Sequence, residues 1–228
     1  METTPAAAIQ ERYGALAKSE TGLSCGSAAR RCEPSPGDVC VDLGCGRGRD
    51  VIELASRVGA SGRAIGVDVT RPMLEAARAA ADAARLTNVS FVESSFESLE
   101  LPDELADWVV SNCALNHAKD KASVWAEIHR VLKSGGRFVV SDIYAVDPIA
   151  EQYRNDPAAV AECWAGAETK DVTLERIVQA GLEDVRIIEE RAPYLRGHAR
   201  LVSFTISGHK PTRPPSSFEG RPSTTPKR

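Results

Sequence analysis

The sequence predicts an α/β fold in which helices pack on a mostly parallel sheet. Short apolar runs alternate with segments of helical period between residues 39 and 142, and a glycine-rich loop follows the first run directly. Repeated strand–helix–strand units form right-handed crossovers between parallel strands. The last two apolar runs, at 185–190 and 201–207, have no helix between them and predict an antiparallel C-terminal hairpin. Together these runs predict a sheet of seven strands.

The elements are predicted in order from two patterns. Buried parallel strands are continuously apolar, and the remaining runs of this kind lie at 39–43, 64–69, 89–92, 107–111 and 137–142. Helices show apolar residues at i, i+3, i+4 and i+7, which places them at 9–18, 50–58, 72–85, 121–133 and 173–180. Pro72 suits a first helical turn. We expect Gly135-Gly136 to end the fourth of these helices.

The chain divides into three regions by composition. Residues 1–37 hold one helix and a loop, and residues 38–208 form the main domain. Within that domain, residues 147–170 break the strand–helix rhythm, so we expect an insertion over the active site. Residues 209–228 contain five prolines, which predicts a disordered tail.

Charge and cysteine content exclude several functions. The 28 Lys and Arg residues against 32 Asp and Glu residues give a formal charge of −4, which disfavours nucleic-acid binding. No apolar run approaches the roughly 18 residues that cross a membrane. The six cysteines include no CxxC pair, and the N-terminus resembles no export signal. We therefore expect a cytoplasmic protein with reduced thiols, no membrane contact and no permanent metal.

The loop from Val41 to Gly48 reads VDLGCGRG and links the first strand to a helix. Glycines let backbone N–H groups approach a ligand closely, although a glycine turn without a ligand is the alternative. Asp68 ends the next strand, where a carboxylate can accept hydrogen bonds from ribose hydroxyls. A carboxylate at Asp42 disfavours a pyrophosphate and suits a positively charged ligand. The pattern favours S-adenosylmethionine over NAD.

Residues 39–143 resemble the Rossmann-like class I S-adenosylmethionine-dependent methyltransferases. The resemblance rests on the glycine loop, on Gly66-Val67-Asp68 and on residues 130–138. It implies a seven-stranded sheet with a reversed final hairpin. In the family, the loop after the third strand often contacts adenine through an Asp, where this chain has Ser95 and Phe96. The resemblance implies cofactor contacts from Asp42, Gly44, Cys45, Gly46, Gly48, Asp68, Val69, Ser95, Phe96 and Asn112.

The cysteines fall into two groups. Cys40 lies within a strand and Cys45 within the glycine loop, where packing accounts for both. Cys25, Cys113 and Cys163 lie on three separate segments that we expect to meet above the sheet. Three thiolates can bind arsenic(III) and leave its lone pair as a nucleophile that needs no general base. The alternative is that these cysteines, too, are core residues.

The chain is also similar to the arsenite methyltransferase family over roughly residues 10–190. The matching pieces are Cys25-Gly26-Ser27 and the segments 48–50, 66–70, 111–116, 141–142, 163 and 165–167. The resemblance implies that Cys25, Cys113 and Cys163 bind the arsenical, and that a thiol reductant such as thioredoxin or glutathione supports turnover. The family's early cysteine pair has only Cys32 as a loose counterpart, and His117 replaces the family's usual residue.

Two other functions stay open from the sequence. One is methyl transfer to a small organic acceptor with His117 as general base. The other is a non-catalytic, thiol-based metalloid sensor that uses the same fold as a scaffold. An intact glycine loop followed by Asp68 argues for catalysis, whereas cofactor binding without turnover would argue for the sensor.

Overall fold

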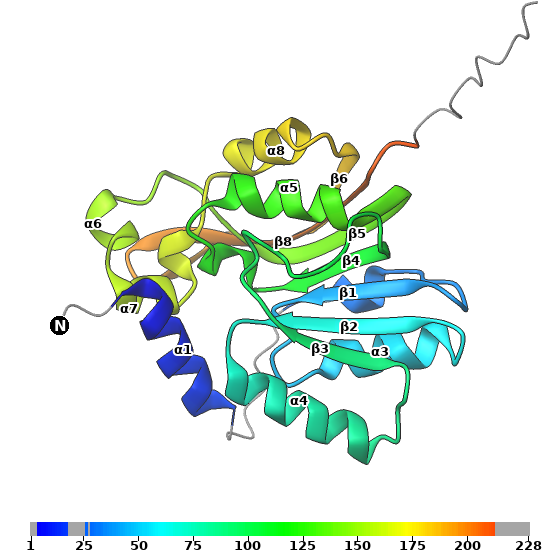
Figure 1. The fold of residues 1–228 in the computed structure, drawn as a ribbon. Coiled ribbons are helices and arrows are strands. Elements are labelled where there is room, and N and C mark those ends of the chain that lie inside the picture. The colour runs from blue at the N-terminus through cyan, green and yellow to red at the C-terminus, as the bar shows by residue number, and fades with distance from the viewer. Residues whose placement is uncertain (1–3, 18–25, 27, 213–228) are drawn as a thin grey trace, which may run out of the picture.

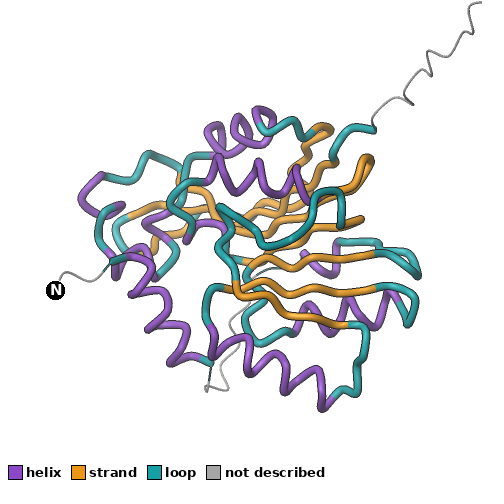
Figure 2. The backbone as a smooth tube through the Cα atoms, in the orientation of Figure 1, coloured by secondary structure: helices purple, strands orange, loops and turns teal. Residues whose placement is uncertain are grey.

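A computed structural model describes residues 4–17, 26 and 28–212. One sheet runs through the molecule in the order β3-β2-β1-β4-β5-β8-β6, with β7 paired to β8. Helices lie on both of its faces, as Figures 1 and 2 show. The α/β class and the mostly parallel sheet with antiparallel C-terminal strands are confirmed.

The strands divide into a parallel and an antiparallel half. The parallel strands are β1 (Val39–Leu43), β2 (Arg63–Asp68), β3 (Val89–Glu93), β4 (Ala106–Asn112) and β5 (Leu132–Ala145). The antiparallel strands are β6 (Glu183–Glu190), β7 (Tyr194–Arg196) and β8 (Ala199–His209). Strand β8 lies between β5 and β6, which leaves β6 at the edge.

The helices follow the predicted order, with several short ones added. Between the strands of the main domain lie α3 (Arg49–Val58), α4 (Arg71–Ala83), η1 (Leu115–His117), α5 (Lys121–Val131) and α8 (Lys170–Gln179). The N-terminal region holds α1 (Pro5–Leu16) and α2 (Ala28–Arg31). The segment 147–170 holds α6 (Glu151–Arg154), α7 (Pro157–Ala161) and η2 (Trp164–Gly166).

Apolar side chains on the two faces of the sheet form separate cores. On one face, Val109 and Phe138 pack with Ile128 of α5 and Ile177 of α8. On the other face, α2, α3 and α4 cover Cys40, Val110 and Val139. Buried strand residues therefore alternate between two helical layers, which is why the parallel strands are apolar on both sides.

The structure differs from the sequence prediction in the region of β5. Helix α5 ends at Val131, and Leu132 is already extended and paired with Ala106 of β4. The prediction that Gly135-Gly136 ends this helix is therefore wrong, because both glycines lie inside β5. Pairing with β4, rather than a glycine, ends the helix.

The C-terminal strands also extend further than expected. Strand β7 is an eighth strand that the sequence did not predict. Strand β8 reaches His209, and the buried Lys210 donates a hydrogen bond from Nζ to the carbonyl oxygen of Leu132 at 2.9 Å. The ordered sheet thus reaches residue 209, where the tail was predicted to begin. Residues 213–228 lie outside the described part of the chain.

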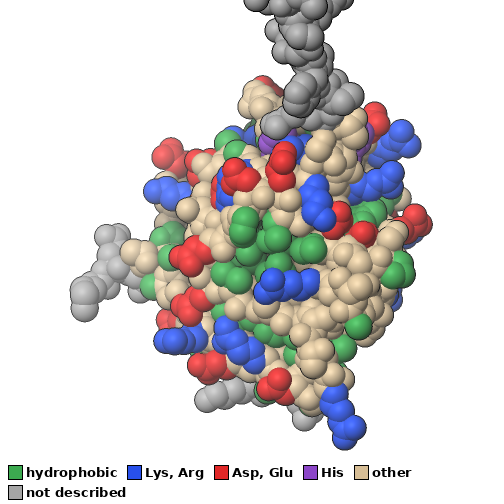
Figure 3. Space-filling view, turned by 45° about the vertical axis from the view of Figure 1, so that its right-hand side comes forward, with side chains coloured by type: hydrophobic (Ala, Val, Ile, Leu, Met, Phe, Trp, Pro, Cys, Tyr) green, Lys and Arg blue, Asp and Glu red, His purple; other side chains and the backbone are tan. Residues whose placement is uncertain are grey.

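The insertion lies beside the N-terminal helix at the carboxyl ends of the strands. Helices α6 and α7 stand next to α1 in Figure 1, and α1 also contacts α4. Helix α1 therefore crosses this edge of the sheet from α7 to α4. Within residues 4–17, 26 and 28–212, no helix is long and apolar enough to cross a membrane. On the face in Figure 3, Lys and Arg side chains alternate with Asp and Glu, so the described residues show no extended basic patch there.

Candidate functional site

The glycine loop after β1 needs its glycines for packing and for an open surface. Gly44, Gly46 and Gly48 have φ angles of 76°, 50° and 80°, in the left-handed region. A Cβ atom on Gly44 would lie 2.2 Å from the Cβ of Ala114, and one on Gly48 would lie 2.9 Å from the Cβ of Ala77. Around Gly46, no described atom lies within 4 Å of such a position. The loop is therefore packed at both ends and open in the middle.

Asp68 holds the open part of this loop. Its carboxylate accepts hydrogen bonds from the backbone N–H of Gly46 at 3.0 Å and from that of Thr70 at 2.8 Å. Burial raises the pKa of Asp68, while these two N–H donors lower it. The predicted ribose-binding carboxylate is thus fixed beside the loop at the end of β2.

Three carboxylates gather under the loop. Asp42 is only 3% exposed. Its pKa is raised well above the usual range, first by burial and then by the nearby charges of Asp50 and Asp68. Burial also raises the pKa of Asp50. A positively charged ligand relieves this repulsion and an anionic pyrophosphate increases it. The cluster fits the sulfonium and ammonium groups of S-adenosylmethionine.

Other predicted cofactor residues lie around the loop. Phe96 is buried, and its ring comes 3.5 Å from the position of a Cβ on Gly44. The carbonyl oxygen of Val69 accepts a hydrogen bond from Nε2 of Gln10 in α1 at 3.4 Å. The hydroxyl of Ser95 instead donates to the carboxylate of Glu97. Phe96 and Val69 thus border the loop, while the side chain of Ser95 is engaged within its own turn.

Asn112 at the end of β4 fixes the N-terminal segment. Its Oδ1 accepts a hydrogen bond from the N–H of Ala28 at 3.1 Å, and its Nδ2 donates to Asp50. A Cβ on Gly26 would lie 2.0 Å from Asn112 Oδ1 and 2.6 Å from the Cβ of Ser141. Only glycine fits at this close approach. Asn112 therefore positions Gly26 and Ala28 beside β4 and β5, a role that the sequence did not indicate.

Two of the three predicted arsenic-binding cysteines lie together. The Sγ of Cys163 is 3.8 Å from the carbonyl oxygen of Cys113 and 4.0 Å from Oδ1 of Asp142. Cys163 is 7% exposed, whereas Cys113 is half-buried. Cys25 lies outside the described residues, although Gly26, which follows it, lies against the end of β4. The arrangement brings two thiol-bearing segments to the same end of the sheet.

The backbone at both cysteines is strained. Cys113 has a φ of 52° and Cys163 a φ of 74°, a region that costs an L-residue roughly 1–2 kcal/mol. Each is held by its surroundings: the N–H of Cys113 donates to the carbonyl of Ser141 at 2.8 Å, and Gly166 packs against Asn116. Strain of this kind is typical of residues that a functional site holds in place.

Asp142 connects the two cysteine segments and is a residue whose role the sequence did not predict. Its carboxylate accepts hydrogen bonds from the N–H of Leu115 at 3.1 Å, from Nδ2 of Asn116 at 2.8 Å and from the N–H of Ile143 at 2.8 Å. Burial raises its pKa to about 6. These bonds fix the turn after Cys113 to β5, next to the thiol of Cys163.

His117 has a partner on each ring nitrogen. Nε2 lies 2.9 Å from the hydroxyl of Tyr13, and Nδ1 lies 3.1 Å from the carbonyl oxygen of Val160. The carbonyl can only accept, so Nδ1 carries the proton and Nε2 accepts from Tyr13. Burial lowers the pKa of His117 to about 4. A weakly basic imidazole with both nitrogens engaged is poorly suited to be the general base for an organic acceptor.

The remaining described cysteines are packing residues. Cys40 and Cys32 are fully buried in the core beneath α2 and α3, and Cys45 is 7% exposed. Burial raises the pKa of the Cys45 thiol, and a hydrogen bond with Cys40 followed by burial raises that of Cys32. The prediction that Cys40 is a core residue is confirmed. Thiols with raised pKa values are unreactive as nucleophiles.

Comparison with known proteins identifies relatives. A family model described as "Methyltransferase domain" matches residues 34–190. The arsenite methyltransferase of Halobacterium salinarum is 34% identical over 203 residues, which cover 85% of this chain and 52% of that protein. The arsenite methyltransferase of Aquipseudomonas alcaligenes is 41% identical over 158 residues, or 66% of this chain and 46% of that protein.

A solved structure shares both sequence and fold. The arsenic(III) S-adenosylmethionine methyltransferase of Chlamydomonas reinhardtii is 30% identical with a TM-score of 0.73, and the match covers 90% of this chain and 74% of that one. The chain spans about half the length of the curated relatives it matches. The matched domain includes the glycine loop, Asp68 and both strained cysteines. The chain therefore belongs to the methyltransferase domain family, within the class I S-adenosylmethionine-dependent methyltransferases.

Proposed function

We propose that this protein transfers a methyl group from S-adenosylmethionine to trivalent arsenic held by the thiolates of Cys25, Cys113 and Cys163. The observation that carries the proposal is the contact of the Cys163 thiol with the backbone of Cys113, because it joins two segments 50 residues apart at the end of the sheet. The names of the relatives, which are arsenite methyltransferases, support the same substrate.

The cofactor end of the reaction belongs to the loop after β1. S-adenosylmethionine, when bound, supplies an electrophilic methyl group on a sulfonium. We assign its positive charge to the cluster of Asp42, Asp50 and Asp68, whose pKa values are raised, first of all by burial, so that a neighbouring cation would stabilise their charged forms. We assign the remainder of the ligand to Gly44, Gly46 and Gly48 and to the neighbouring Val69 and Phe96.

The acceptor end belongs to the cysteines. A thiolate set that binds arsenic(III) leaves its lone pair exposed, so the protein's task is to position the atom rather than to remove a proton. Cys113 and Cys163 both have positive φ angles, which few L-residues adopt. Asp142 fixes the turn that carries Cys113. These constraints support the assignment of Cys113 and Cys163 as two of the arsenic ligands.

A thiol reductant completes the proposed cycle. The electron pair of the new arsenic–carbon bond comes from arsenic, so two electrons must be returned before arsenic is trivalent again. Thioredoxin or glutathione is the class of partner that supplies them through thiol–disulfide exchange.

The test is an assay with labelled S-adenosylmethionine, arsenite and a thiol reductant. We expect Cys25→Ser, Cys113→Ser and Cys163→Ser each to lower methyl transfer to arsenic by about a hundredfold, since each change removes a positioning ligand. Cys32→Ala is the control, because Cys32 is fully buried in the core that holds Cys40, and it should retain transfer.

Two outcomes would contradict the proposal. If the wild type binds arsenite and S-adenosylmethionine but transfers no label, the chain is a sensor and the proposed reaction is wrong. If Cys113→Ser and Cys163→Ser keep full activity, arsenic methylation does not depend on the proposed thiol set.

A further inference from the structure

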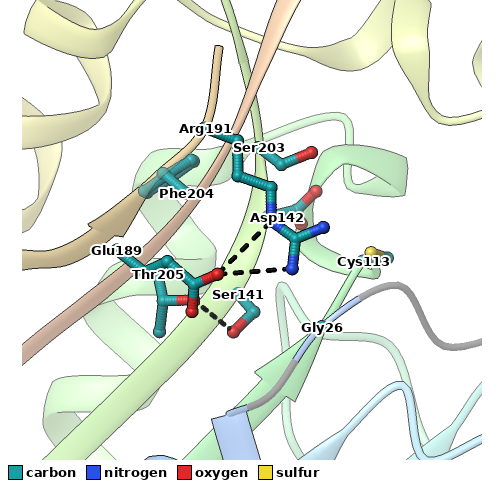
Figure 4. A pocket seen from close by; sticks show the side chains of 9 residues that line it. All are labelled: Gly26, Cys113, Ser141, Asp142, Glu189, Arg191, Ser203, Phe204 and Thr205. Atoms are coloured by element: carbon teal, nitrogen blue, oxygen red, sulfur yellow. Dashed lines mark hydrogen bonds and ion pairs between the residues drawn. The ribbon is translucent and has the colours of Figure 1, made fainter.

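Asp142 is a buried carboxylate that lies near the end of β5, beside two of the proposed arsenic ligands. Its side chain is 6% exposed, and its Oδ1 lies 4.0 Å from the Sγ of Cys163. A pocket of about 310 Å³, part of which is open to solvent, is lined by Asp142 and by Cys113, and Figure 4 shows both side chains. The carboxylate is therefore close to both cysteine segments.

The hydrogen bonds of Asp142 stabilise its negative charge without cancelling it. The carboxylate accepts from the backbone N–H groups of Leu115 and Ile143 and from the side-chain amide of Asn116. Donors of this kind favour the ionised form of a carboxyl group. None of the three carries a charge, so the field of the carboxylate acts on its surroundings.

Two neighbouring carboxylates are held differently, because each is paired with arginine. Glu168 is buried, and both of its oxygens accept hydrogen bonds from Arg176 at 2.8 Å. Glu189 lines the same pocket as Asp142 and pairs with Arg191, as Figure 4 shows, and also with Arg31. The charges of Glu168 and Glu189 are thus neutralised by guanidinium groups.

The proposed reaction moves a positive charge toward the cysteines. Arsenic(III) bound by three thiolates is neutral, whereas the methyl donor carries its charge on a sulfonium. The lone pair of arsenic forms the new arsenic–carbon bond, and the electron pair of the broken sulfur–carbon bond stays on the sulfur of S-adenosylhomocysteine. Arsenic therefore becomes a cation during the transfer, until a thiol reductant returns two electrons to it.

We infer that Asp142 stabilises the positive charge that arsenic acquires as it takes the methyl group. The inference rests on the proposed function and adds to it a residue that acts on the reacting atom through its charge. Arsenic bound at Cys163 is one bond from the sulfur that Asp142 approaches. The arsenic thiolate complex is neutral before the transfer, so the carboxylate contributes little to its binding. A charge that is effective only in the transition state raises kcat rather than affinity.

Asp142→Asn tests the inference, because it removes the charge and keeps the shape of the side chain. We expect the rate of a single turnover, measured by rapid quench with labelled S-adenosylmethionine at saturating arsenite, to fall about tenfold or more. The Kd of arsenite should change by less than about threefold. It is measured by the fluorescence of Trp164, which is buried and follows Cys163 directly.

Glu168→Gln is the matched control. It makes the same change from carboxylate to amide at a buried residue, but the charge that it removes is already paired with Arg176. Neither the rate of the single turnover nor the Kd of arsenite should change.

Lys121→Met tests the same electrostatics with the opposite sign and leaves Asp142 in place. Burial lowers the pKa of Lys121, and the charges of Glu168, Asp142 and Cys163 raise it, so its ammonium lies near the cysteines. Its Nζ donates to the carbonyl oxygen of Ala118 at 3.0 Å. A cation at this position opposes the charge on arsenic, so its removal should speed the single turnover about threefold.

The outcomes separate this inference from the proposed function. If the wild type transfers no label to arsenic, the proposed function is wrong and the inference falls with it. If the wild type transfers label and Asp142→Asn keeps the same single-turnover rate, the inference alone is overturned.

Two further results would overturn the inference. One is an arsenite Kd that rises in Asp142→Asn as much as the rate falls, because Asp142 then acts on arsenic capture or on the fold. The other is a single turnover in Lys121→Met that is no faster than in the wild type, a comparison that holds even if Asp142→Asn does not fold.

Discussion

The hydroxyl of Tyr13 donates a hydrogen bond to Nε2 of His117 across 104 residues of sequence, at 2.9 Å. The rings also meet edge to face, with centroids 5.2 Å apart. Nδ1 of His117 donates in turn to Val160 in α7. One histidine therefore ties α1 to the turn after Cys113 and to the helix that precedes Cys163. The contact fixes the helix that crosses the sheet edge.

Tyr13→Phe removes the hydroxyl that donates to His117 and leaves Nε2 of this buried imidazole without a hydrogen-bond donor. We expect a loss of about 1–2 kcal/mol in the free energy of unfolding, measured by urea denaturation. We also expect faster hydrogen exchange in α1, because the helix loses its bond to His117. Tyr194→Phe is the control, since Tyr194 is exposed in β7. Equal exchange rates in α1 of the wild type and Tyr13→Phe would show that the bond does not hold the helix.

His117 should make the fold sensitive to acid. Burial lowers its pKa from 6.5 to about 4, so the unfolded chain binds a proton that the folded protein does not. This stabilisation is complete above pH 6.5 and is lost as the pH falls toward 4. From the 1.36 kcal/mol that corresponds to one pKa unit, it amounts to roughly 3 kcal/mol.

The comparison with His117→Gln isolates this effect. Asp142, whose pKa is raised to about 6, contributes with the opposite sign: its stabilisation is complete below pH 3.8 and is lost as the pH rises through 6. Asp142 is present in both proteins and cancels in the difference. We expect the wild type to lose stability relative to His117→Gln between pH 6.5 and 4. Parallel stability curves would contradict the depressed pKa.

Asp42→Asn should make the ligand-free protein more stable and weaken its binding of S-adenosylmethionine. The buried carboxylate of Asp42 faces Asp50 and Asp68, and its pKa is raised above the usual 3.8. Its removal should raise the free energy of unfolding without ligand by about 1 kcal/mol or more. The gain should be absent below pH 3.8, where the carboxyl is protonated in both states, and grow as the pH rises.

The same change should weaken S-adenosylmethionine binding about tenfold in a calorimetric titration, because the ligand's positive charge loses a buried partner. Asp82→Asn on the exposed side of α4 is the control and should alter neither quantity. An unchanged affinity in Asp42→Asn would remove Asp42 from the cofactor site.

Gly166→Ala tests how the two cysteine segments are held together. A Cβ at Gly166 would lie 1.9 Å from the carbonyl oxygen of Asn116, so η1 and η2 must separate. We expect the free energy of unfolding to fall by about 2 kcal/mol or more. We also expect weaker binding of arsenite, measured by the change in fluorescence of Trp164, which is buried and follows Cys163 directly. Gly14→Ala in α1, whose Cβ would lie 3.8 Å from Pro72, should be neutral or stabilising. Wild-type arsenic capture in Gly166→Ala would contradict the role of this contact.

Local patterns in the sequence predicted most of the fold. The strand at 39–43 appears where its apolar run placed it, and the helix predicted at 121–133 begins at Lys121 as expected but ends at Val131. Strand β7 was missed because Tyr194–Arg196 has no apolar alternation and is defined only by its pairing across Gly197 with β8. The start of β5 at Leu132 likewise depends on pairing with Ala106. Pairing between distant segments cannot be inferred from the period of either one.

In the candidate site, too, local motifs were predicted from the sequence and contacts between distant residues were not. The motifs and the family resemblance indicated the glycine loop, Asp68 and the three cysteines Cys25, Cys113 and Cys163. They did not indicate that Tyr13 engages His117 or that Arg191 and Cys113 line the same pocket, because the members of each pair lie far apart in the sequence. Side-chain roles that arise from such contacts require the three-dimensional structure.

The parallel half of the sheet carries the glycine loop, and the antiparallel half carries residues that line the pocket at Cys113. The glycine loop and Asp68 come from β1 and β2, while Glu189, Arg191 and Ser203 come from the antiparallel half. Under the proposed function, substitutions at the end of β6 and along β8 would change the surroundings of Cys113 and leave the residues of the loop after β1 unchanged. A lineage that carries this domain can therefore change its acceptor while it keeps its methyl donor.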